Sequence, residues 1–227
     1  MNALEKFETD TLPTSAGDLA ITFLGHGSLL LAFRGQTIYV DVFGKVADYS
    51  KLPKADIVFL THEHSDHMDP DALASVRTGK TVLVYTEACA RQAEGGIVMR
   101  NGDRKTVDGI PVEAVAAYNL IHMRENGQPF HTKGAGNGYI LTFGDTRVYV
   151  AGDTENIPEM KALQDIAVAF LPMNLPYTMT PEMAAEAARA FKPKILYPYH
   201  FGKTDTQKLV EFLKDEKGIE VRIRKMM

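Results

Sequence analysis

The sequence has a single cysteine and no surplus of positive charge, and these two shortages exclude several kinds of protein. Cys89 has no second cysteine to pair with, so neither an internal disulfide nor a zinc cluster built from cysteines can form. We expect this thiol to be a small buried side chain. The formal net charge of −4 provides no basic field that would attract phosphate groups, so a nucleic-acid partner is not expected.

Long apolar runs are also missing. No stretch reaches the roughly 18 apolar residues that a membrane helix needs, so no transmembrane segment is expected. The first twenty residues carry charged side chains where a secretion signal has an apolar core, namely Glu5, Lys6, Glu8, Asp10 and Asp18. For the chain as given we expect a cytoplasmic protein, and a periplasmic location stays open if a leader has been removed.

No linker or low-complexity stretch divides the 227 residues. We predict a polar lead-in at residues 1–20 and a single domain at residues 21–227. Apolar runs predict strands at 21–24, 29–33, 37–40, 57–60, 81–85, 110–116, 139–143, 147–151, 166–171 and 194–197. Helices are predicted at 69–76, 87–93, 157–163, 180–191 and 206–214, and a long loop at 126–138. Each half is a strand meander followed by alternating helices and strands, which predicts an α/β fold, a four-layer αββα sandwich.

A dense group of histidine and aspartate residues follows the apolar run 57–60, in the segment Thr61-His62-Glu63-His64-Ser65-Asp66-His67. In an extended segment alternate side chains share one side, so His62 and His64 project together toward one metal ion. Asp66 and His67 follow where the chain turns toward the next helix, in a position to bind a second ion. Ligands at the end of a buried strand are held firmly and stay open to substrate.

This segment resembles the T-H-x-H-x-D-H signature of the metallo-β-lactamase superfamily. Further pieces follow in the order of that family, so that the resemblance spans residues 21–224: Gly25-His26-Gly27-Ser28, Asp41, Ala151-Gly152-Asp153-Thr154 and His200. The resemblance implies the metallo-β-lactamase fold, with Asp153 bridging two metal ions and His200 as the last ligand of the second site. It also implies that Asp41 orients a ligand histidine. His26 either contacts substrate or only forms a turn between its two glycines.

The chain departs from many members of this superfamily at the third ligand of the first site, where it has Asn119 in place of histidine. An amide oxygen is a weaker zinc ligand than imidazole, so this site binds weakly, prefers a harder ion such as manganese, or takes another ligand. His131, on the following loop, is the nearest candidate for a replacement ligand. His122 on the same loop is a weaker candidate, with a solvated loop side chain as the alternative.

The order of these motifs most resembles a subgroup of metal-dependent hydrolases related to ascorbate-phosphate lactonases. N-acyl-phosphatidylethanolamine phospholipase D is a more distant relative. The expected cofactors are one or two divalent ions, with zinc, manganese or nickel favoured. Such an ion lowers the pKa of its bound water to about 7 and so supplies a hydroxide nucleophile at neutral pH.

We therefore predict a metal-dependent hydrolase that cleaves an ester, lactone or phosphodiester bond in a small-molecule or lipid-like substrate. Asp66 or Asp153 is predicted to pass a proton to the leaving group, and Asn119, His26 and Tyr177 to contact the substrate. A homo-oligomer is compatible with the sequence. The alternative is a metal-binding sensor or scaffold without catalysis, which the two aspartates disfavour because structural zinc sites are normally closed by cysteine and histidine.

Overall fold

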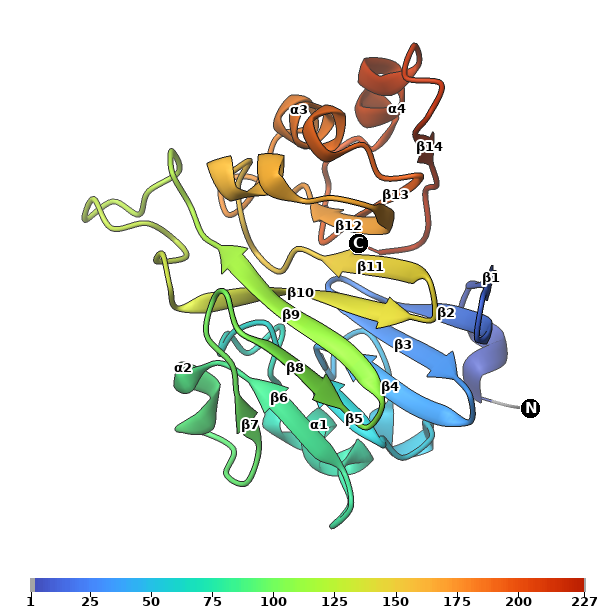
Figure 1. Ribbon diagram of the computed structural model, residues 1–227. Coiled ribbons are helices and arrows are strands. Elements are labelled where there is room, and N and C mark those ends of the chain that lie inside the picture. Colours follow the sequence, from blue (N-terminus) through green and yellow to red (C-terminus); the bar gives the residue numbers. More distant parts are fainter. Residues whose placement is uncertain (1–2, 227) are drawn as a thin grey trace.

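Two mixed β-sheets pack face to face at the centre of the computed structural model, which describes residues 3–226 (Figure 1). Helices cover the outer face of each sheet, so the four-layer αββα sandwich predicted from the sequence is confirmed. Among residues 3–226 no helix is both long enough and apolar enough to cross a bilayer.

The first half of the chain forms the first sheet and its helices. Its elements, with η denoting a 3-10 helix, are η1 (Ala3–Lys6), β1 (Thr9–Thr14), β2 (Gly17–Gly25), β3 (Ser28–Phe33), β4 (Gln36–Val40), η2 (Tyr49–Lys51), β5 (Ile57–Phe59), α1 (Pro70–Val76), β6 (Val82–Tyr85), α2 (Glu87–Ala90) and β7 (Ile97–Val98). The strands lie in sequence order. Strands β1 to β4 pair antiparallel, whereas β4 to β7 pair parallel.

The second half repeats this arrangement in the other sheet. Its elements are β8 (Arg104–Val107), β9 (Ile110–Ala117), β10 (Gly136–Phe143), β11 (Thr146–Val150), η3 (Pro158–Ala162), β12 (Ile166–Pro172), α3 (Pro181–Phe191), β13 (Ile195–Tyr199), α4 (Gln207–Leu213) and β14 (Glu220–Val221). Strands β8 to β11 pair antiparallel, and β11 to β14 pair parallel.

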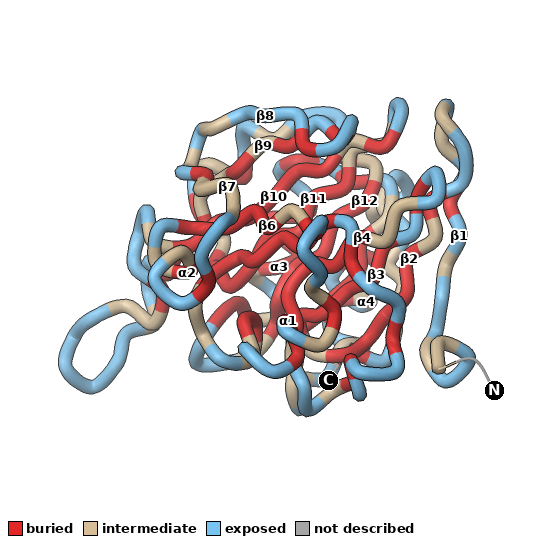
Figure 2. Tube along the Cα trace, turned by 90° about the horizontal axis from the view of Figure 1, so that it is seen from below, coloured by how far each residue is buried: buried red, intermediate tan, exposed pale blue. Residues whose placement is uncertain are grey.

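Alternate side chains of the strands enter different parts of the core. In β3, Leu29 and Leu31 belong to the cluster between the sheets, whereas Leu30 belongs to the cluster that contains Leu73 and Val76 of α1. This is the period of two that an extended strand imposes on its side chains. The central strands are accordingly buried along most of their length, and exposure is concentrated in the connecting loops and the edge strands (Figure 2).

Two helices were predicted to begin with a capping residue followed by a proline, and both are confirmed. Asp69 Oδ1 accepts hydrogen bonds from the backbone N–H groups of Asp71 and Ala72, and Thr180 Oγ1 accepts one from that of Met183. A proline follows each cap, where its missing N–H is not needed.

The weakest strands are where the sequence prediction was wrong. Strand β1 lies inside the predicted lead-in at residues 1–20. It pairs with β2, with Thr9 opposite Thr22. Residues 1 and 2 of the lead-in lie outside the described range. Only Leu12 of this edge strand is buried and Pro13 interrupts its donors, so its sequence carries almost no apolar alternation. The first sheet therefore begins at Thr9 and not at residue 21.

Other boundaries also differ from the prediction. Strands β7 and β8 were not predicted, and β8 has only one buried residue, Val107. Strand β10 begins at Gly136, inside the predicted loop, because Gly136 and Gly138 supply backbone pairing without a side-chain signal. The segment predicted as an α-helix at 157–163 is the 3-10 helix η3.

Candidate metal centre

Eight side chains with metal-binding atoms converge where the central parallel strands end. They are His62, His64, Asp66 and His67 after β5, Asp153 after β11, His200 after β13, His26 in the turn between β2 and β3, and His131 in the loop between β9 and β10. The carboxyl ends of parallel strands are where open α/β sheets usually place their sites. Both sheets thus contribute to one centre.

The first cluster consists of His62, His64 and His131, whose nitrogen atoms all lie within 4.8 Å of one another. His62 Nε2 is 3.0 Å from His64 Nδ1. The shared side that the sequence predicted for these two side chains is therefore observed. His131, the candidate replacement ligand, joins them from the β9–β10 loop.

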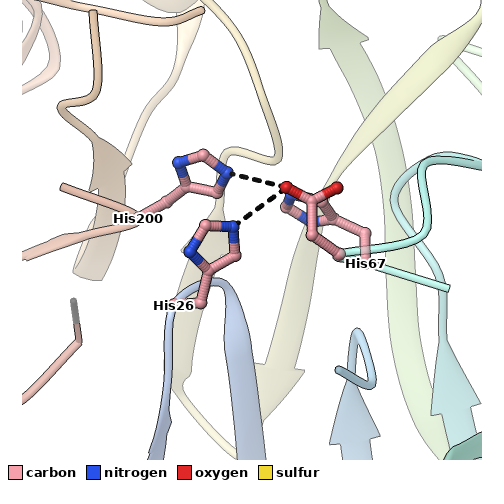
Figure 3. Close-up of side chains that lie close together, drawn as sticks. His26, His67 and His200 are labelled. Atoms are coloured by element: carbon pink, nitrogen blue, oxygen red, sulfur yellow. Dashed lines mark hydrogen bonds and ion pairs between the residues drawn. The ribbon is translucent and has the colours of Figure 1, made fainter. Parts of the chain in front are cut away.

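The second cluster consists of His26, Asp66, His67 and His200. Figure 3 shows the rings of His26 and His200 both turned toward one carboxylate oxygen. This atom is Oδ2 of Asp66, which is 3.1 Å from His26 Nε2 and 3.8 Å from His200 Nε2. Three separate segments of the chain therefore meet around a single carboxylate.

Asp153 lies between the two clusters. Its Oδ2 is 3.3 Å from Nε2 of His131 and 3.4 Å from Nε2 of His200, and its Oδ1 is 3.4 Å from Nε2 of His67. The side chain is 4% exposed. One buried carboxylate is thus placed to contact ligands of both clusters.

Several buried atoms of this centre have no hydrogen-bond partner among the described residues, namely His67 Nε2, Asp153 Oδ1, His200 Nδ1 and His200 Nε2. Buried polar atoms are almost always paired, so unpaired nitrogen and carboxylate oxygen atoms grouped at one buried centre fit a bound cation. Imidazole nitrogens with carboxylate oxygens suit first-row divalent metals. The residues present therefore fit a metal ion.

Asp41 orients one of the ligands from behind. Its Oδ2 accepts a hydrogen bond from His67 Nδ1 at 2.7 Å and from the Thr61 hydroxyl at 2.8 Å, and its Oδ1 accepts one from the Thr61 N–H. The bond to Nδ1 leaves Nε2 of His67 facing the centre. This agrees with the orienting role that the resemblance implied.

A second relay orients His131. Asn119 Oδ1 accepts hydrogen bonds from Nδ1 and from the backbone N–H of His131, both at 2.8 Å. The amide group of Asn119 is itself fixed, because its Nδ2 donates to Glu155 Oε1 and to the Tyr177 carbonyl. A proton held on Nδ1 leaves the Nε2 lone pair of His131 directed at the centre.

Burial and neighbouring charges set the protonation of the centre. Burial lowers the pKa of His62 well below its usual value, and the charge of His67 adds to this effect. Burial would raise the pKa of Asp153, yet His200 and His67 hold it well below its usual value. Burial opposes protonation of His67, but the carboxylates of Asp153 and Asp41 raise its pKa well above its usual value.

Three residues of the centre have a left-handed backbone, which is rare for residues other than glycine. The φ angles are 54° at His26, 52° at Asp41 and 46° at His200. Such conformations cost about 1–3 kcal/mol each and gather at functional sites. Their coincidence here indicates that side-chain placement in the centre outweighs local backbone preference.

A cavity of 640 Å³ opens over both clusters, with Asp66, His131 and Tyr177 among its lining residues. Tyr177 therefore lies on the cavity wall, a position from which it could make the substrate contact predicted for it. His26 and Asn119 do not line this cavity; they contact Asp66 and His131 instead.

His122 lies outside both clusters. Its Nδ1 is 2.6 Å from Glu155 Oε1. It is therefore neither a member of a cluster nor the freely solvated loop side chain that was the alternative. Glu155 was not predicted, although it is fully buried and also accepts hydrogen bonds from the N–H groups of Leu120 and Ile121. Glu155 follows Asp153, the aspartate after β11, but nothing in the sequence indicates that it contacts residues more than thirty positions earlier.

Comparisons with known proteins agree with the fold. The β-lactamase superfamily domain matches residues 20–200. A Parabacteroides distasonis protein described as a metal-dependent hydrolase is 49% identical, with a TM-score of 0.93 over 97% of this chain and 100% of that one.

A UPF0173 metal-dependent hydrolase of Methanopyrus kandleri is 30% identical over 195 residues, which cover 81% of this chain and 84% of that protein. A metallo-β-lactamase fold protein of Bacillus subtilis, 14% identical, superposes with a TM-score of 0.70 over 89% of this chain and 90% of that one. The metallo-β-lactamase fold implied by the signature is thus confirmed. The chain therefore belongs to the β-lactamase superfamily and, within it, to the UPF0173 family of metal-dependent hydrolases.

Proposed function

We propose that this chain hydrolyses an ester, lactone or phosphodiester bond with the help of two divalent ions, one in each cluster. The observation that supports this most directly is the position of Asp153, within 3.4 Å of ligands from both clusters. A carboxylate shared between two ions is typical of two-metal hydrolytic sites, whereas a structural zinc site is closed by its own four ligands.

The first ion would be held by the first cluster and the second by Asp66, His67 and His200, with Asp153 shared. When bound, the ions would lower the pKa of water and balance negative charge that develops on the substrate. Zinc, manganese and nickel all suit a donor set of imidazole and carboxylate groups.

Asp66 is the group we assign to proton transfer. Its side chain is 39% exposed and lines the cavity, whereas that of Asp153 is almost completely buried. His26 donates to Oδ2 of Asp66 and so holds the carboxylate in one orientation. The other oxygen, Oδ1, stays available to carry a proton to the leaving group.

His131 takes the place of the missing third histidine in this proposal. Asn119, at the position where many superfamily members have that histidine, positions His131 through Nδ1 and contacts neither the cavity nor the other ligands of the first cluster. We therefore assign Asn119 a positioning role in place of the substrate contact predicted from the sequence.

Metal removal and reloading test the proposal. Protein stripped with a chelator is expected to lose turnover of a panel of 4-nitrophenyl esters, lactones and bis(4-nitrophenyl) phosphate, and to regain it with zinc, manganese or nickel. Turnover that survives complete metal removal would overturn the proposal. Full loading with no turnover of any substrate would favour the metal-binding module without catalysis.

A histidine pair on one loop tests the assignment of His131. The H131A variant is expected to bind one equivalent of metal in place of two, measured by elemental analysis, and to lose about 100-fold or more in kcat because the first ion is lost. The matched H122Q variant changes a histidine of the same loop that lies outside both clusters, and it should retain two equivalents. Two equivalents in H131A would remove this residue from the ligand set.

A further inference from the structure

We propose that the cavity over the metal centre selects substrates that carry a negatively charged group, a carboxylate or a phosphate, in addition to the bond that is cleaved. Lys45 and Arg124 are the residues that would bind this group. The inference rests on the proposed function for the cleaved bond, and it adds the class of substrate.

Lys45 and Arg124 are the only cationic side chains among the described residues that line the cavity, and both are exposed. Neither lies within ion-pair distance of a carboxylate in the described part of the chain. Arg147 of β11 and Arg104 of β8, by contrast, both pair with Glu113. What distinguishes Lys45 and Arg124 from the other exposed cations is their position on the wall of the cavity over the metal centre.

The acids of the cavity do not neutralise these cations, because each is engaged elsewhere. Asp69 accepts hydrogen bonds from the N–H groups of Gly44 and of the first turn of α1. Asp66 is held by His26, and Asp153 by the histidines of both clusters. Once ions occupy the clusters, Lys45 and Arg124 would be the cationic side chains on the cavity wall, and Asp69 would be the one lining carboxylate among the described residues that lies outside the metal centre.

Each cation is held over an aromatic ring that lines the same cavity. The Arg124 guanidinium carbon is 5.0 Å from the centre of the Phe130 ring, and Nη2 donates to the Phe130 carbonyl at 3.2 Å. Lys45 Nζ is 5.8 Å from the centre of the Phe43 ring. Contacts of this kind restrain a long side chain without neutralising its charge, so each cation keeps hydrogen-bond donors free for a ligand.

Each of these cation–aromatic pairs lies next to a different cluster. The Phe43 ring is 5.3 Å from the ring of His26 in the second cluster, whereas Phe130 precedes His131 of the first cluster and its ring is 5.1 Å from that of Tyr177. An anionic group bound by these cations would therefore lie on the wall of the same cavity, next to an aromatic ring. This arrangement fits an oxyanion joined to the scissile ester by a short apolar spacer.

Three 4-nitrophenyl esters that differ only at the far end of the acyl chain test the inference. They are the butyrate, which is neutral, the hemisuccinate, which ends in carboxylate, and the 3-phosphonopropionate, which ends in phosphonate. Metal-loaded wild-type protein is expected to prefer one or both anionic esters over the butyrate by about 10- to 100-fold in kcat/KM, as charge-assisted hydrogen bonds allow. The two anionic esters decide between carboxylate and phosphate.

The K45Q/R124Q variant is expected to lose most of this preference, measured as the ratio of kcat/KM for the anionic and neutral esters. The K80Q/R91Q variant removes two exposed charges outside the cavity and should keep the wild-type ratio. The single variant R124K should keep only part of the wild-type preference, because an ammonium group cannot bind an oxyanion in bidentate fashion.

An equal ratio in wild type and K45Q/R124Q would overturn the inference and leave the proposed hydrolysis intact. If the wild type cleaves none of the esters, calorimetric titration of the metal-loaded proteins with 3-phosphonopropionate decides instead. Binding about 10-fold or more weaker in K45Q/R124Q would support the inference even then, and equal binding would end it.

Discussion

Single residues behind the metal ligands decide how the ligands are presented. Asp41 and Asn119 each accept a hydrogen bond from Nδ1 of a histidine, His67 in one case and His131 in the other. Each contact fixes the tautomer in which Nε2 carries the lone pair that a metal requires. The two clusters therefore share a design in which a fully hydrogen-bonded acceptor sits behind an imidazole.

The D41N variant tests this at the second cluster. Asparagine must turn an NH₂ group toward either His67 or Thr61, so one of the contacts made by the carboxylate is lost. We expect metal affinity to fall about 10- to 100-fold, measured by competition with a chromophoric chelator. The control D108N changes an exposed aspartate that has the same left-handed backbone, with φ of 45°, and should bind metal like the wild type. Equal affinity in both variants would contradict the orienting role of Asp41.

At this scale the sequence predicted residues that lie together in one motif and missed those that meet only through the fold. His62, His64, Asp66 and His67 are close in sequence and follow one strand, so local geometry predicts their convergence. Glu155 acts on a loop more than thirty residues away, and no periodicity reports such a contact. Arg124 lies in a long loop where charged side chains are usually solvated, so the sequence did not distinguish it from its neighbours.

The elements show the same division between strong and weak local signals. Strands with continuous apolar runs and helices with a cap and proline were predicted, because burial on one face and unsatisfied N–H groups at a helix start both restrict the sequence. Edge strands β1 and β8 each bury one residue, so their pairing depends on the neighbouring strand and not on their own pattern.

Two helix starts with threonine allow a matched test of capping. Thr180 accepts a hydrogen bond from the N–H of Met183 at the start of α3, whereas Thr206 makes no side-chain capping bond at α4. T180A is expected to lower the free energy of unfolding by about 1 kcal/mol, and T206A by clearly less. Urea unfolding followed by circular dichroism measures both. A similar loss in the two variants would mean that the threonines act through packing and not through the cap.

Considered as a whole, the molecule joins its first strand to the C-terminal part of the second sheet through one carboxylate. Asp10 of β1 accepts hydrogen bonds from Tyr197 of β13 at 2.5 Å and from Arg224 beyond β14 at 2.7 Å. Burial opposes ionisation, but Tyr197 and Arg224 hold the pKa of Asp10 below its usual value of 3.8. This group ties the edge of the first sheet to the second.

The lowered pKa of Asp10 predicts that the stability of the protein falls at acidic pH. Ionised Asp10 contributes stability above the unfolded value near pH 4, and the contribution disappears as pH falls through the lower folded value. D10N should therefore lower the unfolding free energy by about 1–2 kcal/mol at neutral pH, and by progressively less below pH 4. Unfolding curves at several pH values measure this difference. D18N, an exposed aspartate of the same hairpin, should show no difference at any pH.

The ligands proposed for the two ions come from segments far apart in the sequence, from His62 after β5 to His200 after β13. During synthesis on the ribosome, the early histidines emerge long before the partners that complete either cluster. Until Asp153 and His200 have been synthesised, neither proposed donor set is complete, so a metal ion would be bound less tightly by the nascent chain than by the folded protein. Under the proposed function, metal loading would therefore be a late event, and a retained ion would mark a chain in which both sheets have folded together.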